Sequence, residues 1–174
     1  MKKEVAILGV GMTSFGRVTG RGVTDMAREA GEMALKDAGV SYKDIQIGFC
    51  AHVNQSVGSG KECFAQLGMT GIPITNIEIA CASHTRAVMI MSDLIAAGVY
   101  DLGLVIGVEK MPRGMVPFGD RSEMPYHHLL GILPMPAIYA MEAQEHMHQY
   151  GSRPEHFAKA GEKAHRNGSL NPRA

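Results

Sequence analysis

Four short apolar runs divide the first 110 residues, and each is separated from the next by a segment with helical spacing. Each run is continuous and contains β-branched residues, which is the pattern of a strand buried on both faces. The runs are VAILGV at 5–10, DIQIGFC at 44–50, PITNIEI at 73–79 and LGLVIGV at 102–108. Strands that alternate with helices are joined by crossover connections, which give a mainly parallel sheet with helices on both faces. The sequence therefore predicts a layered α/β fold.

The segments between the runs are predicted to be helices. In residues 24–38 the apolar side chains form one stripe, with Thr24 as the expected N-cap and Gly39 just past the end. Residues 83–97 are apolar almost all round, which predicts a helix sunk in the core. The Gly-x-Gly at 9–11 lacks the glycine spacing of a dinucleotide fingerprint, and we interpret it as a tight turn.

The pattern becomes irregular in the last third of the chain. Residues 110–136 contain five prolines and are too irregular for a buried layer, so we expect a long loop there. The two helices expected after it are residues 137–151 and 152–168. In the second, Ser152 and Glu155 have capping-box spacing, and Pro154 suits the first turn.

Charge balance and cysteine spacing limit the classes of function. The chain of 174 residues has 17 basic and 17 acidic side chains, which argues against a nucleic-acid partner. Its cysteines, Cys50, Cys63 and Cys81, lack zinc-site or disulfide spacing, which indicates a reducing, cytoplasmic compartment. The histidine pairs at 127–128 and 146–148 also lack metal-ligand spacing, so no metal is expected. No apolar run approaches the ~20 residues that span a bilayer, so no membrane span is expected.

Cys81 falls at the turn between the run that ends near Ile79 and the helix expected from Ser83. The first turn of a helix has unpaired N–H groups and favours negative charge, which lowers the pKa of a thiol placed there. The carboxyl end of a parallel strand also faces the crevice in which open α/β sheets bind ligands. Because Ala80 and Ala82 are small, a substrate can approach. Cys81 therefore suits a nucleophile that becomes acylated, although spacing alone leaves a packed core cysteine as an alternative.

The other two cysteines have weaker signals. Cys63 lies beside Phe64 in a short helical stretch, where packing is the favoured role. Cys50 ends a strand, and with His52 and Asn54 it is a minor candidate for the crevice.

Three stretches resemble segments of the thiolases. NIEIACASHTRAVMIMSDLIAAGVYDLGLVIGVEKM at 76–111 resembles the thiolase nucleophile segment, in which a Cys-Ala-Ser turn leads into a buried helix and a strand. AILGVGMTSFGR at 6–17 resembles the first strand and turn, and EHMHQYGSRPEHFAKAGEKAHRNGSLNP at 145–172 resembles a helix pair. The resemblance is closest to the sterol-carrier-protein or lipid-transfer type of thiolase and runs through the whole chain.

The resemblance implies a Claisen-type reaction on acyl-coenzyme A. Cys81 matches the family nucleophile, which attacks the ketone of a 3-ketoacyl thioester and holds the acyl group until coenzyme A removes it. Coenzyme A is then a substrate, and no bound cofactor is expected. For the fold, the resemblance implies that residues 1–110 are an N-terminal thiolase-like core. Residues 111–174 would be the start of the loop domain with a helix pair, and the C-terminal thiolase half would be absent.

The chain departs from the family pattern at two points. A glycine usually follows Cys-Ala-Ser, and this chain has His84. Residues three apart share a helix face, so His84 is a candidate to pair with the Cys81 thiolate, or alternatively to line the pocket or cap a carbonyl. No cysteine follows Cys81. The family's second catalytic cysteine, its histidine and its oxyanion hole come from the C-terminal half and would have to be supplied by another chain.

Three functions are consistent with these observations. The first is a thiolase-type acyltransferase that acts in a homo- or hetero-oligomer with a chain supplying the missing half. The second is a lipid-transfer-type retro-aldol lyase component that works on acyl-coenzyme A with a small accessory subunit. The third is a non-catalytic subunit that binds acyl thioesters or lipids and takes part in an assembly.

Overall fold

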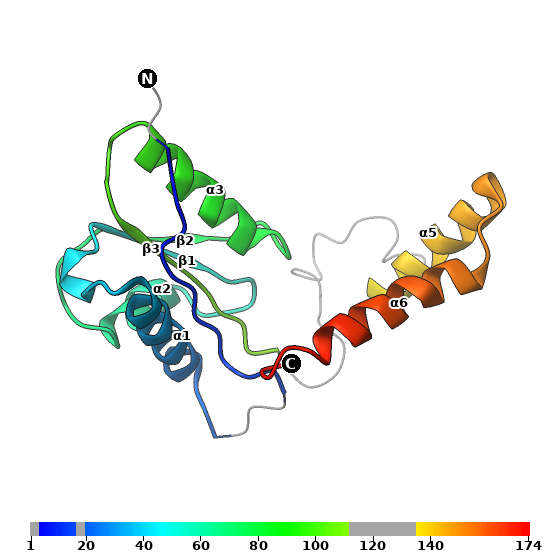
Figure 1. Ribbon diagram of the computed structural model, residues 1–174, viewed down its shortest axis with the longest axis horizontal. Helices are drawn as coiled ribbons and strands as arrows, with labels where there is room; N and C mark the ends of the chain where they lie inside the picture. The colour runs from blue at the N-terminus through cyan, green and yellow to red at the C-terminus, as the bar shows by residue number, and fades with distance from the viewer. Residues whose placement is uncertain (1–3, 17–19, 112–134) are drawn as a thin grey trace. The chain divides into compact units, whose positions relative to one another are not determined.

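The computed structural model describes residues 4–16, 20–111 and 135–174 (Figure 1). These residues form two compact units, Met1–Lys110 with Arg173, and Met111–Pro172 with Ala174. The first unit contains a sheet with helices, and the second contains two helices.

The first unit is built on a parallel sheet of three strands in the order β2-β1-β3. The strands are β1 (Ile47–Ala51), β2 (Ile74–Ile77) and β3 (Gly103–Gly107). Phe49 on the central strand lies opposite Thr75 of β2 and Val105 of β3. All five residues of β1 are buried, as the continuous apolar run predicts. The parallel α/β architecture expected from the sequence is confirmed.

Helices cover both faces of this sheet (Figure 1). The helices of the first unit are α1 (Val23–Ala38), α2 (Ser59–Ala65) and α3 (Ser83–Ala96), with a short 3-10 turn at Tyr42–Asp44. Successive side chains of a strand point to opposite faces. Cys50 therefore packs with Phe64 and Met26 in the core under α1 and α2, whereas Phe49 packs with Met91 in the core under α3.

The second unit contains α5 (Met135–Tyr150) and α6 (Pro154–Gly168), and neither helix buries a residue. The ring of His146 contacts the rings of Tyr150 and Phe157, with centroid distances of 4.8 and 6.0 Å. Pro154 lies in the first turn of α6, as expected. The expected capping box of Ser152 and Glu155 is wrong, because the backbone N–H of Arg153 donates to Nδ1 of His156 at 3.3 Å.

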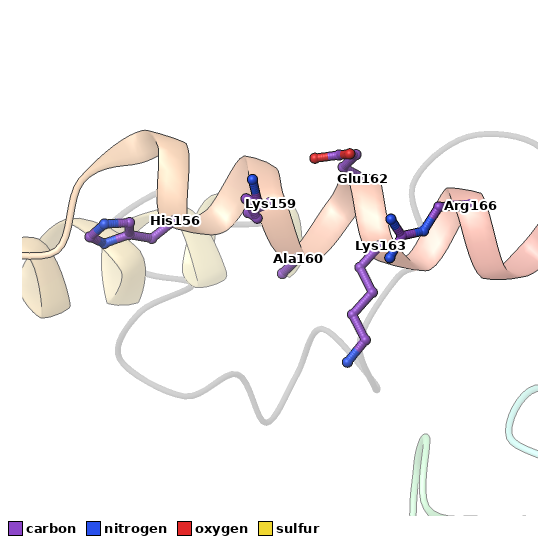
Figure 2. A pocket seen from close by; sticks show the side chains of 6 residues that line it. All are labelled: His156, Lys159, Ala160, Glu162, Lys163 and Arg166. Atoms are coloured by element: carbon purple, nitrogen blue, oxygen red, sulfur yellow. The ribbon is translucent and has the colours of Figure 1, made fainter.

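One face of α6 carries several basic side chains beside a shallow depression of about 340 Å³ (Figure 2). The residues around it are His156, Lys159, Ala160, Glu162, Lys163 and Arg166. Most of the loop expected at 110–136, including His127 and His128, lies outside the described residues. Among the helices that are described, none is long and apolar enough to cross a membrane.

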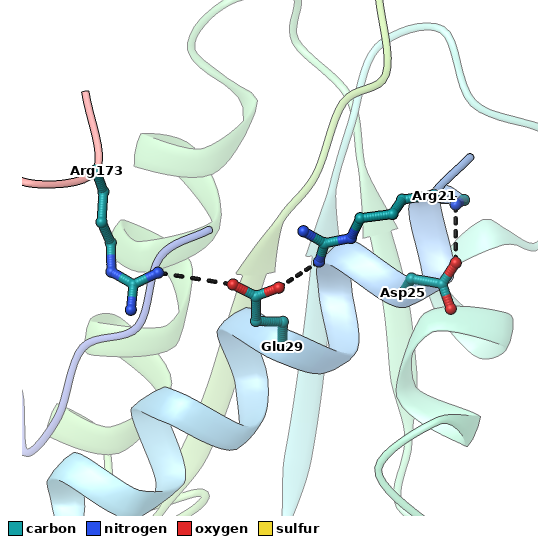
Figure 3. A network of polar contacts seen from close by, with 5 residues as sticks. Arg21, Asp25, Glu29 and Arg173 are labelled. Carbon is teal, nitrogen blue, oxygen red and sulfur yellow. Dashed lines mark hydrogen bonds and ion pairs between the residues drawn. The ribbon is translucent and has the colours of Figure 1, made fainter. Parts of the chain in front are cut away.

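The start of α1 is fixed by side-chain contacts (Figure 3). The N-cap is Gly22 rather than Thr24, because the backbone N–H of Gly22 donates to Oδ2 of Asp25 at 2.8 Å. Glu29 accepts from the guanidinium of Arg21, and Nη1 of Arg173 lies 3.6 Å from the second carboxylate oxygen of Glu29. At the other end Gly39 adopts the left-handed conformation, which confirms the expected C-cap.

Residues 5–10 do not form the first strand that their sequence predicts. The segment makes no backbone–backbone hydrogen bond to any described residue, and Ile7 is 78% exposed. Gly9 and Gly11 do not form a tight turn either. They allow the segment to approach α1, because a Cβ on Gly9 would lie 2.4 Å from the carbonyl oxygen of Ala34. The strand prediction fails because a strand needs a hydrogen-bonded neighbour, and no described segment provides one.

Helix α3 is less buried than its composition predicts. Only Ser83, Ala87 and Met91 are buried, and Met89 is 52% exposed. The expectation of a helix sunk in the core is therefore wrong for the described residues. One face of α3 contacts the sheet, and no described element covers the opposite face.

Candidate active site

Cys81 lies between the end of β2 and the start of α3, with its side chain exposed. The residue before it, Ala80, has a φ of +55° and is the only residue other than glycine with positive φ among those described. A side chain in this left-handed region costs of order 1 to 3 kcal/mol and persists only where neighbouring contacts hold it. The backbone at Cys81 is therefore held in a strained turn.

Ser83 is the residue that holds this turn. Its hydroxyl accepts a hydrogen bond from the backbone N–H of Ile79 at 2.9 Å and donates one to the carbonyl oxygen of Ala80 at 2.6 Å. Its own backbone N–H donates to the same carbonyl at 3.1 Å. Glu78 adds a further contact, because its Oε1 accepts from the N–H of Ala80 at 2.6 Å. Ser83 is buried, so water does not compete for these bonds.

The role of Ser83 could not be found from the sequence. A serine two residues after a cysteine indicates only a small neighbour, whereas the clamp depends on the conformation of Ala80. The structure places Cys81 just before the N-cap residue of α3, Ala82, which makes no side-chain capping bond. Cys81 therefore lies next to the backbone N–H groups at the start of α3.

His84 packs against β3. A Cβ on Gly107 would come within 1.9 Å of Nδ1 of His84, so the imidazole occupies the space that Gly107 leaves open. Burial lowers the pKa of His84 below its ordinary value of 6.5, which favours the neutral imidazole. No hydrogen bond joins His84 to Cys81 among the described residues. The structure thus places His84 beside the sheet, on a groove shared by α1, α3 and β3.

Glu109 links the loops at the carboxyl end of the sheet by hydrogen bonds. Its Oε2 accepts from the backbone N–H groups of Val53 at 2.7 Å and Asn54 at 3.1 Å, and its Oε1 accepts from the side-chain amide of Gln55. These bonds join the segment after β1 to the segment after β3. The crevice of an open α/β sheet lies at this end, so Glu109 holds together two loops at the rim of that crevice.

The side chain of His52 stands at the same rim, and its ring makes no hydrogen bond to a described residue. Both ring nitrogens are buried, and neither contacts a donor or acceptor within the described part of the chain. Buried polar groups normally have partners, so an unpaired imidazole marks a position whose environment is incomplete. The sequence suggests His52 only through its place after a strand.

Cys50 and Cys63 are fully buried in the core under α1 and α2. The hydrogen bond with the Cys63 thiol, together with burial, raises the pKa of Cys50 far above its ordinary value. Packing is therefore confirmed for Cys63, and the suggestion that Cys50 reaches the crevice is wrong. Cys81 is the only exposed cysteine of the three.

Comparison with known proteins identifies the family. Residues 5–159 match the model of the thiolase N-terminal domain. The chain belongs to the thiolase family. The match extends over the sheet, the Cys81 turn and both helices of the second unit up to residue 159.

Two curated relatives illustrate the similarity of this thiolase chain to longer proteins. Sterol carrier protein 2 of Gallus gallus is 34% identical over 99% of the chain and 34% of the relative. The acetyl-CoA acetyltransferase of Methanothermobacter thermautotrophicus is 33% identical over 99% of the chain and 47% of the relative. The chain therefore spans about a third to a half of the length of these relatives.

A solved structure supports the thiolase-like fold. The Ltp2-ChsH2(DUF35) aldolase superimposes with a TM-score of 0.65 over 84% of this chain and 38% of that chain. The two sequences are 23% identical, so this likeness describes the fold alone. Within the described ranges, no three His, Cys, Asp or Glu side chains are grouped to hold a metal ion.

Proposed function

We propose that this chain carries the nucleophile of a thiolase-type acyl transfer and that Cys81 accepts the acyl group. The observation that carries the proposal is the exposed thiol of Cys81 on a strained turn clamped by Ser83. The buried environment of Cys50 and Cys63 removes the other thiols from consideration. The similarity to acetyl-CoA acetyltransferase supports the same reaction class.

The proposed substrate is a 3-ketoacyl-coenzyme A. The Cys81 thiolate attacks the ketone carbon, and the bond between the α- and β-carbons breaks. Its electron pair passes to the α-carbon, which takes up a proton to give the shortened thioester. The acyl group stays on Cys81 as a thioester until the thiol of coenzyme A attacks it and restores the Cys81 thiolate. The second transfer exchanges the thioester on Cys81 for one on coenzyme A, so it is close to balanced in free energy.

We propose His84 as the second site residue of this chain. It stands three residues after Cys81, in the first turn of α3, and burial favours the neutral form of its imidazole, which can accept a proton. The ring packs over Gly107, so it lies between α3 and β3. His84 is then a neutral imidazole on the wall of the acyl site.

The proposed reaction also needs groups that this chain does not contain. No cysteine follows Cys81, so a second catalytic thiol has to come from further thiolase sequence. We propose that this sequence completes the site within an oligomer, because the relatives are two to three times as long as the matched region. Such an oligomer can also include a small accessory subunit.

The test is the intact mass of the purified chain after incubation with acetoacetyl-coenzyme A and with acetyl-coenzyme A. An acyl adduct is expected on the wild-type chain and on Cys63→Ala, and none is expected on Cys81→Ser. A 3-hydroxyacyl thioester in place of the 3-ketoacyl thioester separates aldol-type cleavage from acyl transfer. If no adduct forms but acyl-coenzyme A still binds, the chain is a binding subunit and the proposed nucleophile role of Cys81 is wrong.

A further inference from the structure

The core under α1 and α2 contains two thiols that the proposed reaction does not use. Cys50 lies on β1 and Cys63 lies on α2, and both residues are 0% exposed. A hydrogen bond joins the two thiols, so their sulfur atoms are neighbours. The third cysteine, Cys81, is exposed and belongs to the candidate active site. Cys50 and Cys63 are therefore a buried dithiol between a strand and a helix.

Gly60 allows α2 to lie close to Cys50. A Cβ on Gly60 would come within 2.8 Å of the Cβ of Cys50, so a larger residue at this position would push the helix away. The backbone N–H of Gly60 also donates to Oδ1 of Asn76 at 3.0 Å, which fixes the first turn of α2 to β2. Cys63 follows Gly60 by three residues and shares its helix face. The backbone of α2 is thus held where Cys63 meets Cys50.

The surroundings of the dithiol favour a product without charge. The residues packed around it include Met26, Phe64 and Leu104, and an apolar core disfavours a lasting thiolate. A disulfide carries no charge and no donor that needs a partner. The hydrogen bond with Cys50 lowers the pKa of Cys63, although burial opposes this, and the same bond raises the pKa of Cys50. Cys63 therefore loses its proton more readily, and the thiolate is the nucleophilic form.

The short helix α2 controls access to both thiols. It contains seven residues, and its N-cap Gly58 has a φ of +82° and makes no side-chain capping bond. A helix of this length depends on its packing for stability, because its own hydrogen bonds do not repay nucleation. Local opening of α2 is therefore expected at a lower free energy than global unfolding. A brief opening of this kind admits a small oxidant more readily than a large one.

We propose that Cys50 and Cys63 are a redox-sensitive pair, which a peroxide converts to a disulfide within the folded chain. The Cys63 thiolate attacks one oxygen of hydrogen peroxide, the O–O bond breaks, and the second oxygen leaves as hydroxide, which takes up the proton that Cys63 released. The sulfur of Cys50 then attacks the sulfenic acid on Cys63. The S–O bond breaks, and the hydroxyl leaves with the Cys50 proton as water. One peroxide is reduced to two waters, and two thiols are oxidised to one disulfide.

The disulfide would join β1 to α2 and close the loop of residues 50–63, which contains the rim segment held by Glu109. A crosslink over a loop of this length should lower the equilibrium constant for opening of α2 by about a hundredfold. A thiol reductant reverses the reaction, so the modification is a switch. It goes beyond the proposed acyl transfer, which uses only Cys81 among the thiols of this chain.

The test uses the wild-type chain and peptide mapping by mass spectrometry. Cys81 is first alkylated with iodoacetamide under native conditions, which spares the two buried thiols. Hydrogen peroxide is added, the chain is denatured with N-ethylmaleimide to label remaining thiols, and trypsin then cuts after Lys61, between the two cysteines. The expected product is the peptide 44–61 joined to the peptide 62–86, with the mass of two hydrogen atoms lost. Dithiothreitol should separate the two peptides.

Two glycines provide matched variants for the opening of α2. Gly58 precedes α2 and Gly39 follows α1, both have a left-handed φ, and a Cβ on either would meet nothing within 4 Å. Gly58→Ala strains the start of α2 and should speed formation of the disulfide by about tenfold, whereas Gly39→Ala should leave the rate within about twofold. In the oxidised wild-type chain, the amides of α2 should exchange with deuterium about a hundredfold more slowly than in the reduced chain.

Several results would overturn the proposal. Oxidation of Cys63 to a sulfinic acid, with Cys50 still labelled by N-ethylmaleimide, would show that the two sulfurs do not reach each other. A disulfide found only in a covalent dimer would show that each thiol meets a second copy of the chain. Equal acceleration by Gly58→Ala and Gly39→Ala would show that the bond forms only after global unfolding. None of these readouts measures acyl transfer, so they fail independently of the Cys81 adduct.

Discussion

The two sides of the sheet in the first unit differ in how completely described neighbours cover their apolar side chains and pair with their backbone. On the closed side, formed by β1, the edge of β2 that pairs with it, and α2, Phe49 and Phe64 are buried, and the thiols of Cys50 and Cys63 lie in the core. On the open side, formed by the free edge of β3, residues 5–10 and the outer face of α3, apolar side chains remain exposed. Similar apolar runs occur on both sides, so the difference lies in the available neighbours and not in the residues.

The largest expected contrast is between a buried phenylalanine on the closed side and a leucine on the open side. Phe49 is 4% exposed and Leu8 is 57% exposed. We expect Phe49→Ala to lower the free energy of unfolding by about 3 to 5 kcal/mol, because it leaves a cavity, and Leu8→Ala to change it by less than about 0.5 kcal/mol. Denaturant titration of both variants measures the contrast.

If Phe49→Ala does not fold, Phe49→Leu provides a milder test, with an expected loss of about 1 kcal/mol. Equal losses for the Phe49 and Leu8 variants would contradict the contrast and would mean that residues 5–10 are already packed in solution.

The turn between β2 and α3 joins the closed side to the open side, and Ser83 holds it. Ser83→Ala leaves the N–H of Ile79 and one bond of the Ala80 carbonyl unsatisfied, which should lower the free energy of unfolding by about 2 kcal/mol. Acylation of Cys81 should also slow, because the strained φ of Ala80 relaxes. Denaturant titration and the rate of adduct formation by mass spectrometry measure the two effects.

Ser92→Ala is the matched control for this prediction, because Ser92 lies on the same helix and does not contact the turn. A change in stability without a change in the acylation rate of Ser83→Ala would limit Ser83 to a structural role.

The sequence predicts the closed side better than the open side for a physical reason. The strands β1, β2 and β3 follow from local composition, and Gly39 and Pro154 follow from backbone preferences that act over a few residues. The place of Cys81 at a strand–helix turn also follows from local patterns. Whether residues 5–10 pair depends on a neighbour elsewhere in sequence, which local patterns do not specify.

The contacts within the candidate site also cannot be predicted from the sequence alone. The packing of His84 over Gly107 depends on how α3 lies on β3, and the Ser83 clamp depends on one backbone angle. The first is a tertiary contact, and the second is a local conformation that the residue types alone do not specify. The position of Cys81 at a strand–helix turn is thus predictable, whereas the groups that hold and surround it are not.

A smaller effect is expected at His52, whose buried ring nitrogens lack partners. His52→Leu removes two unsatisfied polar atoms and should raise the free energy of unfolding by about 1 kcal/mol. The matched control is His148→Leu on α5, which is exposed and should change stability by less than about 0.5 kcal/mol. A loss of stability in His52→Leu would show that the imidazole has a partner in solution.

The smallest expected effect is the pH dependence at His84, on the open side. Burial lowers its pKa in the folded state, so the unfolded chain binds a proton more readily than the folded chain. The free energy of unfolding should therefore fall as the pH drops from about 7 through the ordinary histidine pKa of about 6.5 towards the lower folded-state pKa. His84→Gln removes this titration, so the free energy of unfolding of the variant should fall less over the same pH range. Unfolding measured at several pH values with both proteins tests this, and identical pH profiles would mean that the imidazole is as well solvated in the folded chain as in the unfolded one.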